Sequence, residues 1–196
     1  MARQLMKLGV SVEAISICGM ILGLVAGLAL SRTATMPDGI LWWIIALLGC
    51  SARLILTVIG EAIADTWSTT DNIEEESYRQ LPERVSDAVT MIGLGFAELS
   101  NPWLGLATAL LAILSSYSRA LREPFDYRGF MNRKHRLAIV ICTSFIMLFT
   151  TDLTIGGISI PTISLALISI GCASAIIYRW IAPKSKMANR KNSKNR

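Results

Sequence analysis

Histidine is scarce in this sequence of 196 residues, and its cysteines lack the spacing that metal sites need. His135 is the only histidine. It has no second histidine and no serine or cysteine nucleophile pattern beside it, so we do not expect it to be a catalytic base. The four cysteines fall inside apolar segments without metal-ligand spacing. We expect them to be small buried residues, not metal or redox sites: they are Cys18, Cys50, Cys142 and Cys172.

Charged and aromatic residues are also few, at 17% and 7%, whereas hydrophobic residues make up 53% of the chain. The mean hydropathy is +0.50. A water-soluble domain needs a largely polar surface, so this composition excludes that class and predicts lipid around the protein. The apolar residues are mostly aliphatic and form long blocks instead of short alternating runs. That pattern excludes a barrel and predicts helices.

Apolar blocks of about 20 residues suit a hydrocarbon core about 30 Å thick. The chain contains six such blocks, two of them short: Val10–Leu30, Ile40–Ile63, Val85–Leu99, Leu104–Leu121, Leu137–Asp152 and Ile163–Ile181. Pro82, Pro102 and Pro161 stand where helices begin or bend. The predicted fold class is therefore all-α, a polytopic membrane bundle of six transmembrane helices over residues 1–182. Residues 183–196 are predicted to form a basic, disordered cytoplasmic tail.

Lysine and arginine in the connecting segments predict the orientation of the bundle. With six spans and a cytoplasmic N-terminus, Arg32 alone falls on the outer side, and the other basic residues outside the spans fall on the cytoplasmic side. We therefore expect a multi-pass protein of the inner (cytoplasmic) membrane with both termini in the cytoplasm. The net charge of +5 then reports orientation and contact with anionic membrane lipids, and no nucleic-acid partner is expected.

Two segments assigned to the cytoplasmic side carry opposite charge. The one between the second and third spans is acidic: Asp65, Asp71, Glu74, Glu75, Glu76 and Glu83. The one between the fourth and fifth spans is basic: Arg119, Arg122, Arg128, Arg133, Lys134 and Arg136. Such a pair of surfaces could hold a divalent cation beside phosphate groups. The alternative is that two solvated loops simply attract each other.

Carboxylates spaced four residues apart suggest where a cation would bind. Glu61 and Asp65 lie on one helix face, and so do Glu83 and Asp87, because a helix repeats about every 3.6 residues. If the two helices are neighbours, the four carboxylates form a predicted metal site. The alternative is that Glu61 pairs with Arg53, which is eight residues away on the same helix, or with Arg84. A stripe of Gly19, Gly23 and Gly27 predicts close helix packing.

Several short segments then occur in a characteristic order. The most specific are Leu81-Pro82-Glu83-Arg84-Val85-Ser86-Asp87 and Met131-Asn132-Arg133-Lys134-His135-Arg136, and weaker ones are Ala52–Leu56, Pro102–Gly105 and Tyr117–Arg119. Over residues from about 45 to 140, this pattern resembles bacterial members of the CDP-alcohol phosphotransferase family. The start at Gly9–Ser16 is similar to the family's entry into its first span.

This resemblance implies a function in phospholipid biosynthesis. Members of the family transfer a phospho-group from a CDP-linked donor to an alcohol acceptor and release CMP. They usually form dimers, so a second copy of the chain, in a homodimer, is one expected partner. The resemblance implies Mg²⁺ or Mn²⁺ as the cofactor if the chain is active, and it places Glu83 at a signature carboxylate position. With Asp87, which shares its helix face, Glu83 is a candidate catalytic carboxylate. The resemblance also implies that Arg119, Arg133 and Arg136 bind phosphate, and His135 is a further candidate phosphate donor.

The family's signature, Asp-x-x-Asp-Gly-x-x-Ala-Arg and then Gly-x-x-x-Asp-x-x-x-Asp, is degenerate here. Its positions fall on Thr57, Gly60, Glu61, Ala64, Asp65, Glu75, Arg79 and Glu83. Ala64 alone matches, and Glu83 is the one conservative change. Arg79 would repel a metal ion. Three hypotheses follow: a phosphotransferase with a shifted metal site, a catalytically impaired relative that binds lipid or nucleotide or modulates an active paralogue, and an unrelated small transporter. No inverted repeat or broken helix pair supports the third.

Overall fold

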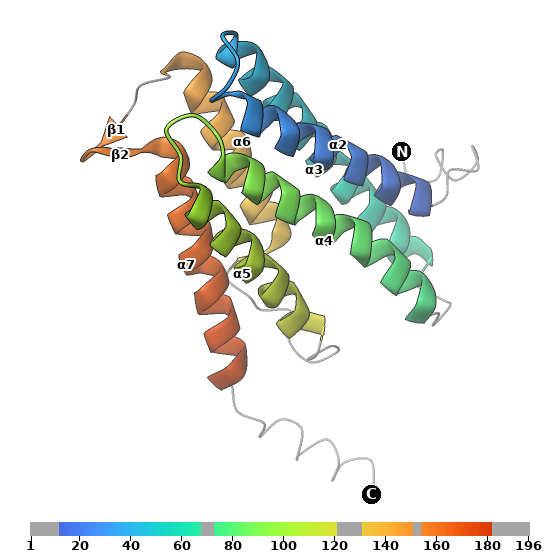
Figure 1. Ribbon diagram of the computed structural model, residues 1–196. Helices are drawn as coiled ribbons and strands as arrows, with labels where there is room; N and C mark the ends of the chain where they lie inside the picture. Colours follow the sequence, from blue (N-terminus) through green and yellow to red (C-terminus); the bar gives the residue numbers. More distant parts are fainter. Residues whose placement is uncertain (1–11, 68–72, 121–130, 151–153, 182–196) are drawn as a thin grey trace, which may run out of the picture.

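The structure, a computed structural model, describes residues 12–67, 73–120, 131–150 and 154–181. The side chains at 12–13, 63–67, 73–80, 119–120 and 155 are outside that description. The described residues form a bundle of six helices and one small hairpin (Figure 1). The helices are α2 (Val12–Arg32), α3 (Gly39–Trp67), α4 (Ile73–Gly95), α5 (Pro102–Ala120), α6 (Arg133–Phe149) and α7 (Ile160–Ile181). The prediction of an all-α fold is confirmed, whereas the predicted tail at 183–196 lies outside the described residues.

Three of these helices are long and apolar enough to cross a membrane. The apolar stretches are Ala14–Arg32 in α2, Gly39–Ala62 in α3 and Ile160–Ile181 in α7. The stretch Pro102–Ser118 in α5 is apolar but shorter. These helices fit a membrane protein, and the count of six spans stays a prediction.

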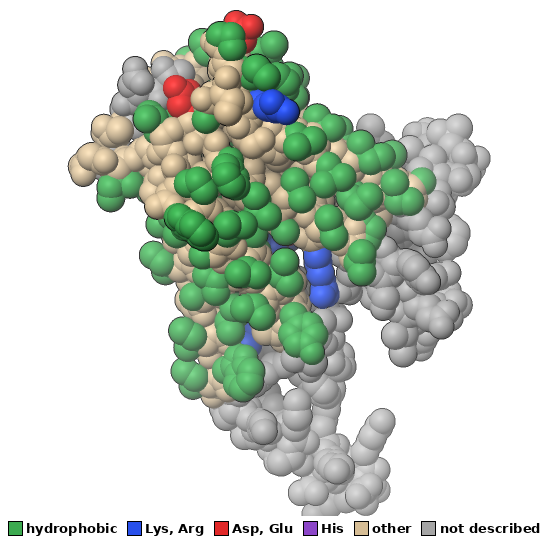
Figure 2. All heavy atoms as spheres, viewed as in Figure 1, with side chains coloured by type: hydrophobic (Ala, Val, Ile, Leu, Met, Phe, Trp, Pro, Cys, Tyr) green, Lys and Arg blue, Asp and Glu red, His purple; other side chains and the backbone are tan. Residues whose placement is uncertain are grey.

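The outward faces of the helices are apolar. Figure 2 shows hydrophobic side chains over most of the visible described surface, with charged groups at only a few places. Large examples are Trp103 on α5, which is 80% exposed, and Trp180 on α7, which is 75% exposed. In water, so much exposed apolar surface would be unfavourable, whereas lipid tails suit it.

The helix that overlaps the third predicted span begins and ends earlier than expected. The apolar block predicted Val85–Leu99, but α4 runs from Ile73 to Gly95. Its first turns contain glutamate, arginine and glutamine, which are good helix formers but do not register as an apolar block. Pro82 lies inside this helix, where its missing N–H removes one intrahelical hydrogen bond.

Both α5 and α7 begin at or next to a proline, as predicted. Pro102 is the first residue of α5, and the Asn101 side-chain oxygen accepts hydrogen bonds from the N–H groups of Trp103 and Leu104 at 3.0 and 3.3 Å. An asparagine cap followed by proline is a favourable helix start, because proline has no N–H that needs a partner there. Pro161 occupies the second position of α7.

A small hairpin, which the all-helical prediction did not include, connects α6 to α7. Strand β1 (Thr154–Ile155) pairs antiparallel with β2 (Ile158–Ser159). Gly156 and Gly157 form the turn with φ angles of 63° and 80°, which glycine adopts without strain. Because each strand is only two residues long, the hairpin does not change the fold class.

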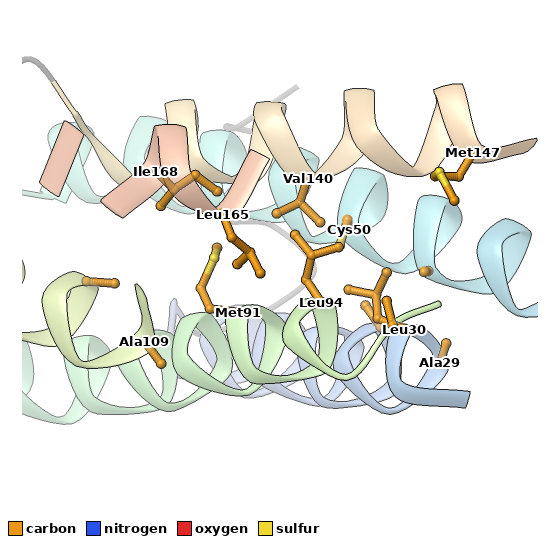
Figure 3. Packing of buried hydrophobic residues seen from close by; sticks show 14 of the residues in the cluster. Ala29, Leu30, Cys50, Met91, Leu94, Ala109, Val140, Met147, Leu165 and Ile168 are labelled. Carbon is orange, nitrogen blue, oxygen red and sulfur yellow. The ribbon is translucent and has the colours of Figure 1, made fainter. Parts of the chain in front are cut away.

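The core lies between the helices and draws side chains from all six. Figure 3 shows Leu30 of α2, Met91 and Leu94 of α4, Val140 of α6 and Leu165 of α7 pointing toward one another. Each of these side chains is fully buried. This shared core fixes the relative positions of the helices that carry the charged residues described below.

Glycines bring α2 and α4 into close contact. A Cβ atom added at Gly27 would lie 2.7 Å from the carbonyl oxygen of Val89, and one added at Gly93 would collide with the backbone of Gly27. Gly23 faces Ser86 of the same helix α4. The predicted packing role of the glycine stripe is therefore confirmed for Gly23 and Gly27, whereas Gly19 has no neighbour within 4 Å of the added atom.

Candidate functional site

Charged side chains from α3, α4 and α6 pair with one another at the end of the bundle where α3 ends and α4 and α6 begin. Five of them are linked through Asp87 and Arg133, and Glu61 and Lys134 form a separate pair. We call the following seven residues the ion-pair network: Arg53, Glu61, Glu83, Asp87, Arg133, Lys134 and Arg136. Their ion pairs join residues that are between 34 and 73 positions apart in the sequence. Four cations and three carboxylates leave the network with one net positive charge.

Asp87 is the buried centre of this network. Its Oδ1 atom contacts the guanidinium of Arg53, and its Oδ2 atom accepts a hydrogen bond from Arg136 Nη2 at 2.7 Å. Arg133 Nε lies 3.5 Å from Oδ1. The side chain of Asp87 is only 6% exposed, and that of Arg53 is fully buried. Charges this far from water are tolerated only when opposite charges and hydrogen bonds surround them.

Arg53 also makes hydrogen bonds that position it beside α4. Its Nη2 donates to the backbone carbonyl of Glu83 at 3.1 Å, and its Nη1 to Thr90 Oγ1 at 3.4 Å. Thr90 in turn donates to the Ser86 carbonyl at 2.8 Å. These bonds fix Arg53 between α3 and α4, so it cannot turn toward a ligand without breaking several contacts.

Two ion pairs of the network lie nearer to its edge. Arg133 pairs with Glu83, with exposed side-chain fractions of 17% and 30%. Lys134 pairs with Glu61, and these side chains are 46% and 47% exposed. The backbone of α4 packs mainly against α2 and α5, and that of α6 mainly against α3. The contacts between α4 and α6 in this region are therefore made by the long arginine side chains of α6.

The predicted phosphate-binding residues lie in surroundings that differ from one residue to the next. Arg136 is buried and engaged with Asp87, whereas Arg133 reaches the edge of the network. His135 is exposed, and its Nδ1 accepts a hydrogen bond from the Asn132 N–H at 3.3 Å, so it helps to start α6. A neutral His135 would then carry its proton on Nε2. The side chain of Arg119, at the end of α5, lies outside the described part of the chain.

The predicted metal ligands do not form a metal site among the described side chains. No group of three histidine, cysteine, aspartate or glutamate side chains comes together in that part of the structure. Glu61, Glu83 and Asp87 are each bound by a cation. This set does not fit a divalent metal, since each carboxylate would first have to leave its arginine or lysine. Asp65, the fourth predicted ligand, has no described side chain.

The degenerate signature positions fall on α3 and α4. Thr57 is buried, and its hydroxyl donates to the Arg53 carbonyl at 3.0 Å. Gly60 lies close to Ile15. Ala64, Asp65, Glu75 and Arg79 belong to the helical segments whose side chains are outside the description. Glu61 and Glu83 are thus the described signature positions that could face a ligand.

Sequence reasoning missed three features of this region. It offered Arg53 as a partner of Glu61, but the partner that the structure gives Arg53 is Asp87, and the one it gives Glu61 is Lys134. It did not single out Arg179, which is buried and donates to the Ser115 carbonyl at 2.6 Å and to Ser118 Oγ at 3.1 Å. An arginine in the last turn of an otherwise apolar helix was the available signal.

No family model and no curated protein matches the sequence, and no solved structure matches the fold. The fold and the ion pairs therefore define a class and not a family. The protein is a helical bundle with apolar helices that fit a membrane, and it carries a charged network between α3, α4 and α6.

Proposed function

We propose that this protein is a CDP-alcohol phosphotransferase-like membrane protein of phospholipid biosynthesis that binds the phosphate groups of a CDP-linked donor. In this proposal the ligand binds at the edge of the ion-pair network, where Arg133 and Lys134 are the reachable cations. The protein lies in the cytoplasmic membrane with this end inward, beside anionic lipids. Two copies of the chain can pair, as the family resemblance implies.

One observation carries the proposal. The two segments that most specifically resemble the family, Leu81–Asp87 and Met131–Arg136, contact each other through ion pairs of Arg133 and Arg136 with Glu83 and Asp87. Nothing in the sequence forces segments about 50 residues apart to meet. A site that binds a donor through both segments requires this proximity.

Charge supports phosphate as the ligand group. The network has an excess of one positive charge, and arginine is well suited to phosphate because its planar guanidinium can donate two parallel hydrogen bonds. Arg133 is partly exposed, so a ligand at the membrane surface can reach it. Lys134 beside it adds a second, more exposed cation.

Between an active enzyme and a catalytically impaired relative, the ion pairs favour the impaired relative. Asp87 is enclosed by three arginines, and the described carboxylates do not form a metal site. One observation favours activity: Glu83, the conservative change in the signature, is 30% exposed and could accept the proton of an alcohol. Its pairing with Arg133 opposes that role, because the guanidinium already occupies an oxygen of this carboxylate.

The test measures binding and turnover separately. The full-length protein is placed in phosphatidylcholine nanodiscs, and its binding of CDP-diacylglycerol is titrated. We expect saturable binding that Arg133→Gln weakens about tenfold, the effect of losing a charge-assisted hydrogen bond worth about 1.5 kcal/mol. Trp103→Phe, on the outward face of α5, is the control that should leave binding unchanged.

Turnover is measured as CMP release with an added alcohol acceptor, such as glycerol phosphate, in Mg²⁺, in Mn²⁺ and in EDTA. We expect no metal-dependent CMP release. Metal-dependent release that Glu83→Ala abolishes would instead identify an active phosphotransferase. Absence of CDP-diacylglycerol binding in every condition would refute the proposed function.

A further inference from the structure

The ion pair between Arg133 and Glu83 occupies the place where the proposed ligand would bind. Within the network, Arg133 is the partly exposed arginine, and Glu83 is the carboxylate that neutralises it at the edge. The neighbouring pairs of Asp87 with Arg53 and Arg136 are buried. A phosphate that approaches Arg133 from the membrane surface therefore meets a site already filled by a carboxylate of the same chain.

The hydrogen-bonding capacity of Arg133 is not exhausted by Glu83. Glu83 contacts Nη1, and the Nε atom of Arg133 is buried without a hydrogen-bond partner among the described residues. This Nε atom lies 3.5 Å from Asp87 Oδ1, which is close enough for an ion pair but long for a hydrogen bond. A guanidinium has five N–H donors, and a phosphate brings more acceptor oxygens than the one oxygen that Glu83 now offers.

Glu83 can leave this position at low cost, whereas Asp87 cannot. The Glu83 side chain is already 30% exposed, so water can solvate it once it turns away from Arg133. Asp87 is 6% exposed and would leave the buried Arg53 and Arg136 without a counter-ion. If a phosphate replaced Glu83, it would balance the charge of Arg133, and Asp87 would still balance Arg53 and Arg136.

We propose that Glu83 is a built-in competitor, a carboxylate that occupies Arg133 until the phosphate of a ligand displaces it. This inference rests on the proposed function for the identity of the ligand. The direction of the change in binding that it predicts does not depend on that identity. A metal ligand or a catalytic base at position 83 predicts that removing the carboxylate weakens binding or activity. A competitor predicts that removing it strengthens binding.

The experiment compares phosphate binding to the wild type and to Glu83→Gln in phosphatidylcholine nanodiscs with EDTA. Three probes separate the sources of phosphate: CDP-diacylglycerol, phosphatidic acid and inorganic pyrophosphate. We expect Glu83→Gln to bind at least one probe about two- to fivefold more tightly, the range that corresponds to a partly exposed ion pair. Glu83→Asp, which keeps the charge, should bind like the wild type.

Two further variants test whether the effect passes through Arg133. Glu98→Gln makes the same change in charge in the connection between α4 and α5, at the other end of the bundle, and should leave affinity unchanged. The double variant Glu83→Gln/Arg133→Gln should bind no better than Arg133→Gln alone. Melting temperatures of all variants in the same nanodiscs confirm that each one is folded.

The outcomes separate this inference from the proposed function. Tighter binding of phosphatidic acid or pyrophosphate by Glu83→Gln, with no binding of CDP-diacylglycerol by any form, supports the competitor and refutes the proposed donor. Binding of CDP-diacylglycerol that Glu83→Gln leaves equal or weakens refutes the competitor and keeps the donor. An equal gain in Glu98→Gln, or no binding of any probe, also refutes the competitor.

Discussion

The ion pairs around Asp87 and the pair between Glu61 and Lys134 use the same chemistry in different surroundings. Asp87 is enclosed by three arginines, whereas Glu61 and Lys134 are each nearly half exposed. Water screens the exposed pair and can replace either partner, but it cannot reach the buried one. The buried pairs therefore join α3, α4 and α6 structurally, and the exposed pairs are free to exchange partners with a ligand.

The largest effect is expected from Asp87→Ala. Removal of the carboxylate leaves Arg53 and Arg136 buried without a counter-ion, which costs about 3–5 kcal/mol of unfolding free energy. Denaturant titration in mixed micelles, followed by tryptophan fluorescence, measures this loss. Asp38→Asn, which removes a carboxylate charge in the connection between α2 and α3 but keeps a side chain that can cap α3, is the control and should change stability by less than about 0.5 kcal/mol. A loss below about 1 kcal/mol in Asp87→Ala would contradict the structural role of these pairs.

An intermediate effect is expected from Arg136→Met. Asp87 keeps Arg53 and Arg133 as partners, and methionine fills part of the volume of the arginine stem. What is lost is one charge-assisted hydrogen bond of 2.7 Å, so we expect a loss of about 1.5–3 kcal/mol in the same titration. A loss as large as that of Asp87→Ala would mean that Arg136 alone neutralises the carboxylate. No loss would mean that Arg53 suffices.

The contrast between buried and exposed pairs explains what the sequence could predict. Long aliphatic blocks predict helices, because they have no other way to satisfy their backbone in lipid. The spacing of four residues between Glu83 and Asp87 predicts a shared helix face, and both residues do contact Arg133. These inferences are local, so they do not depend on which helices are neighbours.

The partners of the charged residues could not be predicted in the same way. Arg53 and Asp87 are 34 residues apart, and their pairing depends on how α2, α3 and α4 pack. Spacing within α3 offered Glu61 as the partner of Arg53, but periodicity cannot decide between a neighbour on the same helix and one on the next.

The polar start of α4 was missed for another reason, since an apolar window ends where glutamates begin. The hairpin had a local signal, the adjacent glycines Gly156 and Gly157, in a segment too short to weigh against the helical pattern.

The smallest effect is expected from Glu61→Gln. The substitution keeps the size of the side chain and removes its charge, so only the ion pair with Lys134 is lost. Because both side chains are nearly half exposed, we expect a change of about 0–1 kcal/mol in unfolding free energy, which 0.5 M NaCl should reduce further. The Asp87→Ala loss should persist in the same salt, since screening does not reach a buried charge. Equal salt sensitivity of the two variants would show that water reaches Asp87, and the division into structural and exchangeable ion pairs would then fail.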